Sequence, residues 1–159
     1  MKHLFFGLVA VGLAGAGFAS EVKYVDAFDL SGSSCGLGLR TRARQSVDGH
    51  PLTVGGKVYE RGFGAHSEGA VGFRTDGKVE SFDALVGVDD DAVEAKKSGR
   101  QAQVVFKVWA DGRIVWTSSV MRDGMKPVAA HVDLRGTREI VLETSSTAPR
   151  LRPRMGSSA

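Results

Sequence analysis

The stretch Gln103–Ser119 reads QVVFKVWADGRIVWTSS and gives the strongest indication of the fold. At its centre, Asp111-Gly112 is typical of a two-residue β-hairpin turn, because both central positions of that turn require positive φ. The flanking runs, Gln103–Ala110 and Arg113–Ser119, are rich in β-branched and aromatic residues, which favour strands. The stretch therefore predicts two antiparallel strands joined by a tight turn.

Regular pairing across this turn defines two faces of the predicted hairpin. It places Trp109 opposite Ile114 and Lys107 opposite Trp116, so that both tryptophans share one face. Val108 lies on the other face, which is also apolar. One face is predicted to cover the core, and the other is either covered by loops or an exposed aromatic surface.

Further short strands lie on both sides of the hairpin. Gly55-Gly56 joins two short candidate strands, and Glu139–Glu143 is the last strand that the pattern supports. The clearest alternation with a period of two has the apolar residues Phe82, Ala84, Val86 and Val88. Only a short helix is predicted, around Asp91–Lys97. This pattern predicts an all-β fold, a jelly-roll β-sandwich.

The first residues predict export. Lys2 precedes the apolar run Leu4–Phe18, and small residues at Gly17 and Ala19 form a cleavage site. Residues 1–19 are therefore expected to be a secretory signal peptide, and the mature protein to be extracellular or periplasmic without a membrane span. The alternative is an uncleaved anchor, for which the run is short and glycine-rich.

The charge distribution argues against a nucleic-acid partner. The chain has 21 Lys and Arg and 18 Asp and Glu. Setting aside Lys2 and the terminal Arg150, Arg152 and Arg154 leaves 17 basic against 18 acidic residues, a net charge of −1. Nucleic-acid binding needs a basic face on the fold, and here the excess lies near the end of the chain.

Three segments in order resemble the signatures of the NPCBM domain, a family similar to carbohydrate-binding module family 51. They are Ser46–His66 (SVDGHPLTVGGKVYERGFGAH), Val86–Asp90 (VGVDD) and Val104–Gly112 (VVFKVWADG). The resemblance covers roughly Val25–Glu143 and places the domain at residues 22–143. It implies a galactose-binding-like jelly roll that binds galactose-containing glycans without catalysis, with a secreted glycoside hydrolase as its expected partner.

Other functions fit the residues less well or remain open. Glycosidases need two carboxylates at a fixed separation in a cleft, and the sequence offers one acidic loop. It has no serine elbow, metal-binding His/Cys spacing or phosphate loop. The alternative from another class is an envelope β-sandwich that contacts proteins and binds no sugar.

His66, Trp109 and Trp116 are candidate carbohydrate-binding residues. His66 could donate to a sugar hydroxyl from a loop, or it could be a buried side chain satisfied by the backbone. Each tryptophan could stack on a sugar ring, or it could be packing within its strand.

Asp89 and Asp90 are candidate carbohydrate-binding residues as well, because carboxylates accept hydrogen bonds from sugar hydroxyls. Asp89, Asp90 and Asp91 are also weak candidates for a structural Ca²⁺ site, since oxygen ligands on a loop suit that ion. The alternative is a solvated acidic loop whose first Asp caps the turn.

The end of the chain departs from the family pattern. Residues 144–159 lack the closing Asp-His-x-x-Trp motif and any strand pattern, so we expect a disordered tail and a missing final strand. One hypothesis is a frameshift, because Arg152–Gly156 can be encoded so that the next frame reads Asp-His-Glu-Trp. A missing strand would leave an unpaired sheet edge.

Overall fold

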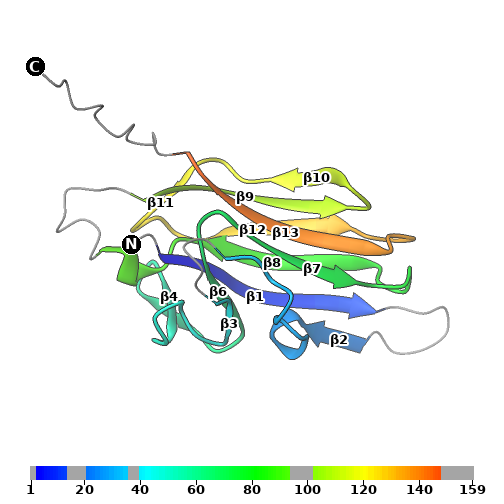
Figure 1. Cartoon of the computed structure of the whole chain (residues 1–159), viewed down its shortest axis with the longest axis horizontal. Coiled ribbons are helices and arrows are strands. Elements are labelled where there is room, and N and C mark those ends of the chain that lie inside the picture. Colours follow the sequence, from blue (N-terminus) through cyan, green and yellow to red (C-terminus); the bar gives the residue numbers. More distant parts are fainter. Residues whose placement is uncertain (1–2, 14–20, 36–39, 94–101, 148–159) are drawn as a thin grey trace, which may run out of the picture.

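The structure, a computed structural model, describes residues 3–13, 21–35, 40–93 and 102–147, which form an antiparallel β-sandwich (Figure 1). The first sheet has the order β12 (Val128–Asp133), β8 (Ser81–Gly87), β1 (His3–Leu13), β6 (Gly62–His66) and β3 (Arg42–Ala43), with β2 (Glu21–Tyr24) paired to β1. The second has the order β10 (Arg113–Thr117), β9 (Gln103–Ala110), β13 (Glu139–Ser146) and β7 (Gly69–Arg74), with β11 (Met121–Arg122) paired to β9. The predicted fold class is confirmed.

Three small elements complete the described fold. The hairpin β4 (Leu52–Val54) and β5 (Lys57–Tyr59) forms a separate two-stranded sheet. Single 3₁₀ turns lie at Val25–Ala27 and Asp90–Val93. The second turn overlaps the helix predicted around Asp91–Lys97, of which residues 94–97 lie outside the described chain. In the described ranges, no helix is long and apolar enough to span a membrane.

The core lies between the two sheets and follows the period-two alternation of the strands. Phe82, Ala84 and Val86 of β8 point inward, as the sequence predicts, and are almost completely buried. They meet Phe106 and Val108 of β9 in one continuous apolar cluster. A smaller cluster, formed by Leu52, Val54 and Tyr59 with Leu85 packed against it, lies between the β4–β5 hairpin and β8.

The hairpin at Asp111-Gly112 forms, but its predicted register is wrong beyond the first two pairs. Ile114 is opposite Trp109 as expected, whereas a β-bulge then places Trp116 opposite Val108 instead of Lys107. Directly opposed residues point to the same face of a sheet. The two tryptophans therefore lie on opposite faces, and Trp116 packs against the core cluster.

The last strand runs beyond Glu143, where the sequence pattern ends it. Strand β13 continues through Ser146, whose N–H donates to Glu68 at 3.0 Å, and the Thr147 N–H donates to the Gln103 carbonyl at 3.0 Å. The serine and threonine residues at this end of the strand show no strand pattern in the sequence. They are held in the sheet by pairing with β9, which is distant in sequence. Strand β13 is paired on both sides, by β7 and β9, so the last described strand is not a sheet edge. Residues 148–159 lie outside the described chain.

The segment predicted to be a leader forms a strand in the whole chain. His3–Leu13 is β1, which pairs with β8 on one side and with β6 and then β2 on the other. An apolar, uncharged run suits a fully buried strand as well as the centre of a signal peptide, so composition does not separate the two. Cleavage after Ala19 stays a prediction.

Candidate functional site

Asp89 is a buried carboxylate at the end of β8. Its two oxygens accept hydrogen bonds from the N–H groups of Thr53 at 3.2 Å and Asp91 at 2.9 Å. Burial raises its pKa to about 6, and the neighbouring carboxylates of Asp91 and Asp90 add to this rise, while the two hydrogen bonds oppose it. With no exposed surface, Asp89 is not available to a sugar in this structure.

Asp90 and Asp91 each use their carboxylates within the same corner of the fold. The Asp90 oxygens accept the N–H groups of Gly55 at 3.0 Å and Gly56 at 2.7 Å, at the turn between β4 and β5. Asp91 lies 2.6 Å from Nδ1 of His50, and this hydrogen bond raises the pKa of that imidazole. The acidic loop therefore fixes the β4–β5 hairpin.

The geometry gives no separate support for calcium. The described side chains include no group of three or more His, Cys, Asp or Glu residues that could hold a metal ion. The Asp89 and Asp90 oxygens are already bonded to backbone amides. The calcium site stays a prediction.

His66 ends β6 and is buried. Its Nδ1 lies 3.0 Å from the carbonyl oxygen of Ser67, and its backbone N–H donates to Cys35 Sγ at 3.0 Å. Only 5% of the residue is exposed. These contacts match the interpretation of His66 as a structural side chain, and they leave little of it at the surface.

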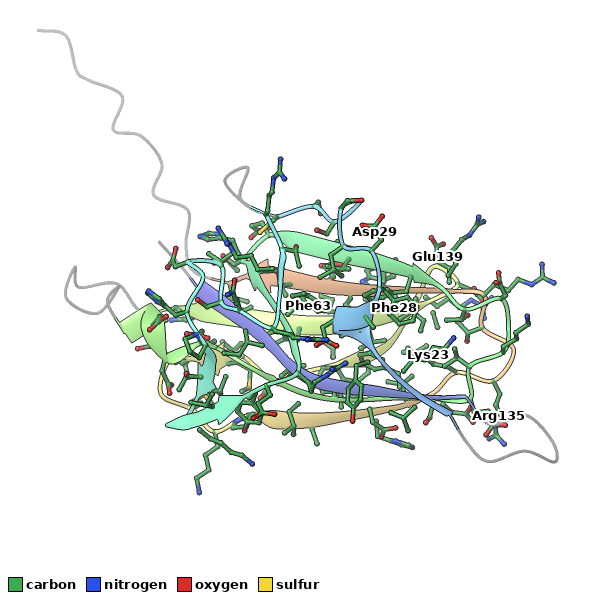
Figure 2. All side chains as sticks on the ribbon, turned by 90° about the horizontal axis from the view of Figure 1, so that it is seen from below. Lys23, Phe28, Asp29, Phe63, Arg135 and Glu139 are labelled. Atoms are coloured by element: carbon green, nitrogen blue, oxygen red, sulfur yellow. The ribbon has the colours of Figure 1, made fainter. Side chains whose placement is uncertain are left out.

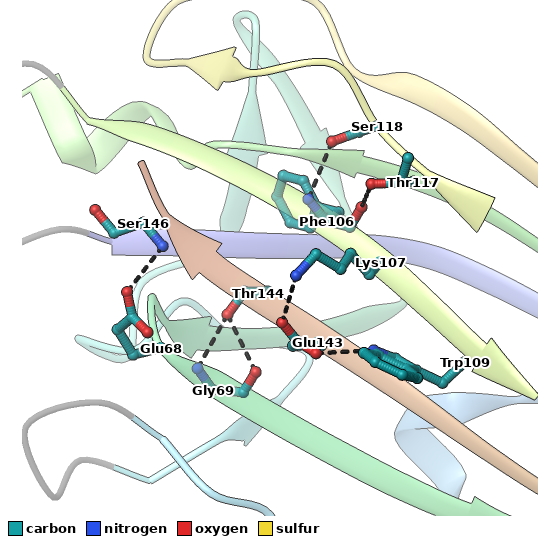
Figure 3. A network of polar contacts seen from close by, with 10 residues as sticks. All are labelled: Glu68, Gly69, Phe106, Lys107, Trp109, Thr117, Ser118, Glu143, Thr144 and Ser146. Atoms are coloured by element: carbon teal, nitrogen blue, oxygen red, sulfur yellow. Dashed lines mark hydrogen bonds and ion pairs between the residues drawn. The ribbon is translucent and has the colours of Figure 1, made fainter. Parts of the chain in front are cut away.

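Trp109 lies on the outer face of the second sheet (Figure 3). Its Nε1 donates to Glu143 Oε2 at 2.8 Å, and Lys107 Nζ donates to Glu143 Oε1 at 2.8 Å. Lys107 is directly opposite Glu143 on β13, and Trp109 is directly opposite Val141. We call these four residues, Lys107, Trp109, Val141 and Glu143, the Trp109 surface.

The Trp109 surface combines an aromatic ring with charged groups that remain partly exposed. The side chains of Lys107 and Glu143 are 26% and 28% exposed. Beyond Val141, the neighbouring strand β7 contributes Gly72, which has no side chain to cover the surface at that position. An indole fixed by a hydrogen bond, beside a donor and an acceptor, can recognise a ligand that has both an apolar face and hydroxyl groups.

A pocket lies beside the loop that carries Phe28 and Asp29, two residues that are labelled in Figure 2. It has a volume of about 560 Å³, and its lining also includes Arg40 and Thr41. Phe28 itself packs edge-on against Phe73, with ring centroids 5.3 Å apart.

The predicted site residues do not form one site. His66 ends β6, and Asp89 follows β8. Both strands flank the start of β1, since His3 pairs with His66 and Phe5 with Gly87. Trp109 lies in the other sheet. Sequence reasoning missed Glu143 and Lys107, because their proximity depends on the pairing of β9 with β13 across more than 30 residues.

Comparison with known proteins adds a family and several relatives. Residues 21–149 match the model of the NPCBM/NEW2 domain. A putative endo-alpha-N-acetylgalactosaminidase of Renibacterium salmoninarum is 34% identical over 98 residues, which cover 62% of this chain and 6% of that protein. The chain thus spans only a small part of this relative.

Two solved structures have the same fold. CBM51-2 of Clostridium perfringens ZmpB, in a complex with GlcNAc and with INT domains, has a TM-score of 0.69 and 22% identity, covering 92% of this chain and 34% of that one. CBM51 of Clostridium perfringens GH95, in a complex with methyl-galactose, has a TM-score of 0.68 and 22% identity. The match covers 81% of this chain and 90% of that one.

Proposed function

This chain belongs to the NPCBM/NEW2 domain family, and from that premise we propose that it is a non-catalytic module that binds galactose-containing glycans. Its place is beside the catalytic domain of an exported glycoside hydrolase, to which it brings the substrate. Export to the extracellular space or the periplasm belongs to the same proposal, because such glycans lie outside the cytoplasm.

The observation that carries the proposal is the Trp109 surface. Trp109 offers a flat apolar area, and its hydrogen bond to Glu143 fixes the ring before any ligand arrives, so that little conformational entropy is lost on binding. Glu143 and Lys107 can accept from and donate to ring hydroxyls at the edge of the indole. Among the other candidates from the sequence, His66 and Asp89 are buried. Asp90 holds the turn between β4 and β5, and Trp116 packs against the core.

Galactose is supported by general sugar chemistry and by the relatives. Its axial 4-hydroxyl leaves one face of the ring apolar, which is the face that stacks on an indole. One structure of this fold was solved with methyl-galactose. Another was solved with GlcNAc, which makes GlcNAc the appropriate competing sugar in a test.

Isothermal titration of the exported protein with methyl-galactose and GlcNAc tests this function. We expect methyl-galactose to bind more tightly, and Trp109→Ala to weaken it about 10-fold or more, the effect of removing an aromatic anchor. Val58→Ala, at an exposed position on β5 in the separate β4–β5 sheet, is the matched control and should bind normally. Arg40→Ala tests the pocket beside Phe28, and a loss of binding confined to this variant would contradict the Trp109 surface as the site.

A specific observation also favours the alternative function in protein contact. Ile114 and Val115 are 49% and 45% exposed on β10, an edge strand. If no sugar binds on a glycan array and the protein instead captures a defined envelope protein, with Ile114→Asp abolishing capture, the module serves protein–protein contact.

Calcium in the Asp89–Asp91 loop is tested by thermal unfolding with calcium and with a chelator. A bound ion would raise the melting temperature in proportion to its affinity. Equal melting temperatures at millimolar calcium and in chelator would contradict a calcium site.

A further inference from the structure

Strand β1 lies outside the part of the chain that matches the family, yet it occupies the middle of the first sheet. The match covers residues 21–149, and β1 is His3–Leu13. In the strand order, β1 separates β8 from β6 (Figure 1). The matched residues therefore leave a space between two strands of the same sheet, which we call the strand slot.

Both walls of the strand slot pair with β1 in defined register. Phe6 is opposite Phe63 on β6 and opposite Val86 on β8, and Gly7 is opposite Gly62 and Leu85. Farther along, β1 is still paired with β8 on one side. On the other side its partner is now β2, from Ala10 opposite Tyr24 to Leu13 opposite Glu21.

Without β1, the first sheet would separate into two parts. Neighbouring strands lie about 4.8 Å apart, so β6 and β8 would face each other across about 10 Å. Their facing N–H and C=O groups would lose their partners, which is costly wherever they are shielded from water. Phe63 and Val86, now 0% and 1% exposed, would border the opening.

The segment in the slot has the composition that this position requires. His3–Leu13 reads HLFFGLVAVGL and contains no Lys, Arg, Asp or Glu. Such a segment brings no Lys, Arg, Asp or Glu charge into the middle of the sheet, and its Phe and Val residues favour strands. Its 11 residues are enough to follow both neighbours along their paired length.

We propose that the strand slot between β6 and β8 is a binding site for an apolar β-strand, and that His3–Leu13 of this chain is its occupant. The strand binds antiparallel to both walls, through main-chain hydrogen bonds, as in other cases of strand addition. In the full chain this segment joins β6 and β8 into one continuous sheet.

Disulfide trapping in the full chain tests the register. Ala10 is directly opposite Asp83. Opposed residues on neighbouring strands are close enough for a disulfide. Ala10→Cys with Asp83→Cys, in a Cys35→Ser background, should oxidise completely under mild conditions. Ala10→Cys with Ala84→Cys is the matched control, because neighbouring residues point to opposite faces of a strand, and it should remain reduced. Equal oxidation of both pairs would overturn the proposed register.

A second measurement tests whether the segment stabilises the fold. Phe6→Pro removes an N–H from the middle of the strand and should lower the melting temperature of the full chain by about 10 °C or more, whereas Phe6→Val keeps a strand-forming residue and should lower it much less. Equal melting temperatures for Phe6→Pro and the parent chain would overturn the proposal.

The exported protein gives the decisive comparison. Intact mass establishes whether residues 1–19 are retained. Retention with cooperative unfolding supports the proposal, as does a shortened protein that unfolds at a much lower temperature. A shortened protein that starts at Ser20 and unfolds at the temperature of the full chain would overturn it.

Discussion

Asp89 makes the stability of the domain depend on pH in the direction opposite to that of a salt-bridged carboxylate. Its pKa is raised from 3.8 to about 6 in the folded state, mainly by burial. Between these values the folded state holds a proton that the unfolded state has lost. The free energy of unfolding therefore falls as pH rises from about 4 to about 6, by about 2–3 kcal/mol at most, and stays lower above that range.

Asp89→Asn tests this dependence. The amide cannot ionise, so the fall in the free energy of unfolding between pH 4 and pH 7 should be largely lost in urea titrations of the variant. One of the two bonds to Thr53 and Asp91 is lost as well, because the amide nitrogen cannot accept, which lowers stability at pH 4 by about 1 kcal/mol. Asp76→Asn, for a carboxylate outside this corner, should keep the parent slope. An unchanged slope in Asp89→Asn would contradict the raised pKa.

Gly64 is required by a close approach between β6 and the preceding segment. A Cβ there would lie 2.5 Å from the Gln45 carbonyl oxygen and 2.8 Å from Ser46 Cα. Both are backbone atoms, which cannot move aside cheaply. We expect Gly64→Ala to lower the free energy of unfolding by about 2 kcal/mol or more.

Gly72 provides the matched control on β7, since a Cβ there would meet nothing closer than 3.9 Å. Gly72→Ala should change the free energy of unfolding by less than about 1 kcal/mol, in either direction. Equal losses for both alanine variants in urea titrations would show that the approach at Gly64 is not limiting.

At the scale of elements, the β4–β5 hairpin depends on one side chain from another part of the chain. Asp90 accepts the N–H groups of both Gly55 and Gly56 at the turn. Removing these bonds in Asp90→Ala should raise amide hydrogen exchange at the two glycines about 10-fold, as expected for about 1.4 kcal/mol of local stability. Asp91→Ala, which removes the contact to His50, should leave exchange at the glycines within about 2-fold. If amide exchange at the two glycines is not faster in either variant, the role of Asp90 is contradicted.

The sequence predicts elements well where the signal is local. The Asp111-Gly112 turn and the inward alternation of Phe82, Ala84 and Val86 are both confirmed. The β-bulge at Val115 has no local signal, because one extra residue in an apolar strand changes no composition. It nevertheless moves Trp116 from the predicted shared face to the core.

At the scale of the whole molecule, strand order was the part that the sequence could not predict. The contact of Trp109 with Glu143 depends on β9 pairing with β13, and the burial of Asp89 depends on Thr53 in a distant hairpin. No motif or residue spacing in the sequence identifies Glu143 or Thr53 as these partners. His3–Leu13 is the clearest case, since an apolar run is compatible with a leader and with a central strand, and only its neighbours distinguish the two.

The bulge at Val115 also affects how copies of the molecule meet. Strand β10 is an edge with free main-chain groups and exposed Ile114 and Val115, a combination that promotes self-association into aggregates. A bulge bends the strand and interrupts the regular spacing of its donors and acceptors, so a second copy cannot extend the sheet there. Deleting Val115 would restore a straight edge, and light scattering of that variant should show aggregation at concentrations where the parent protein remains dispersed.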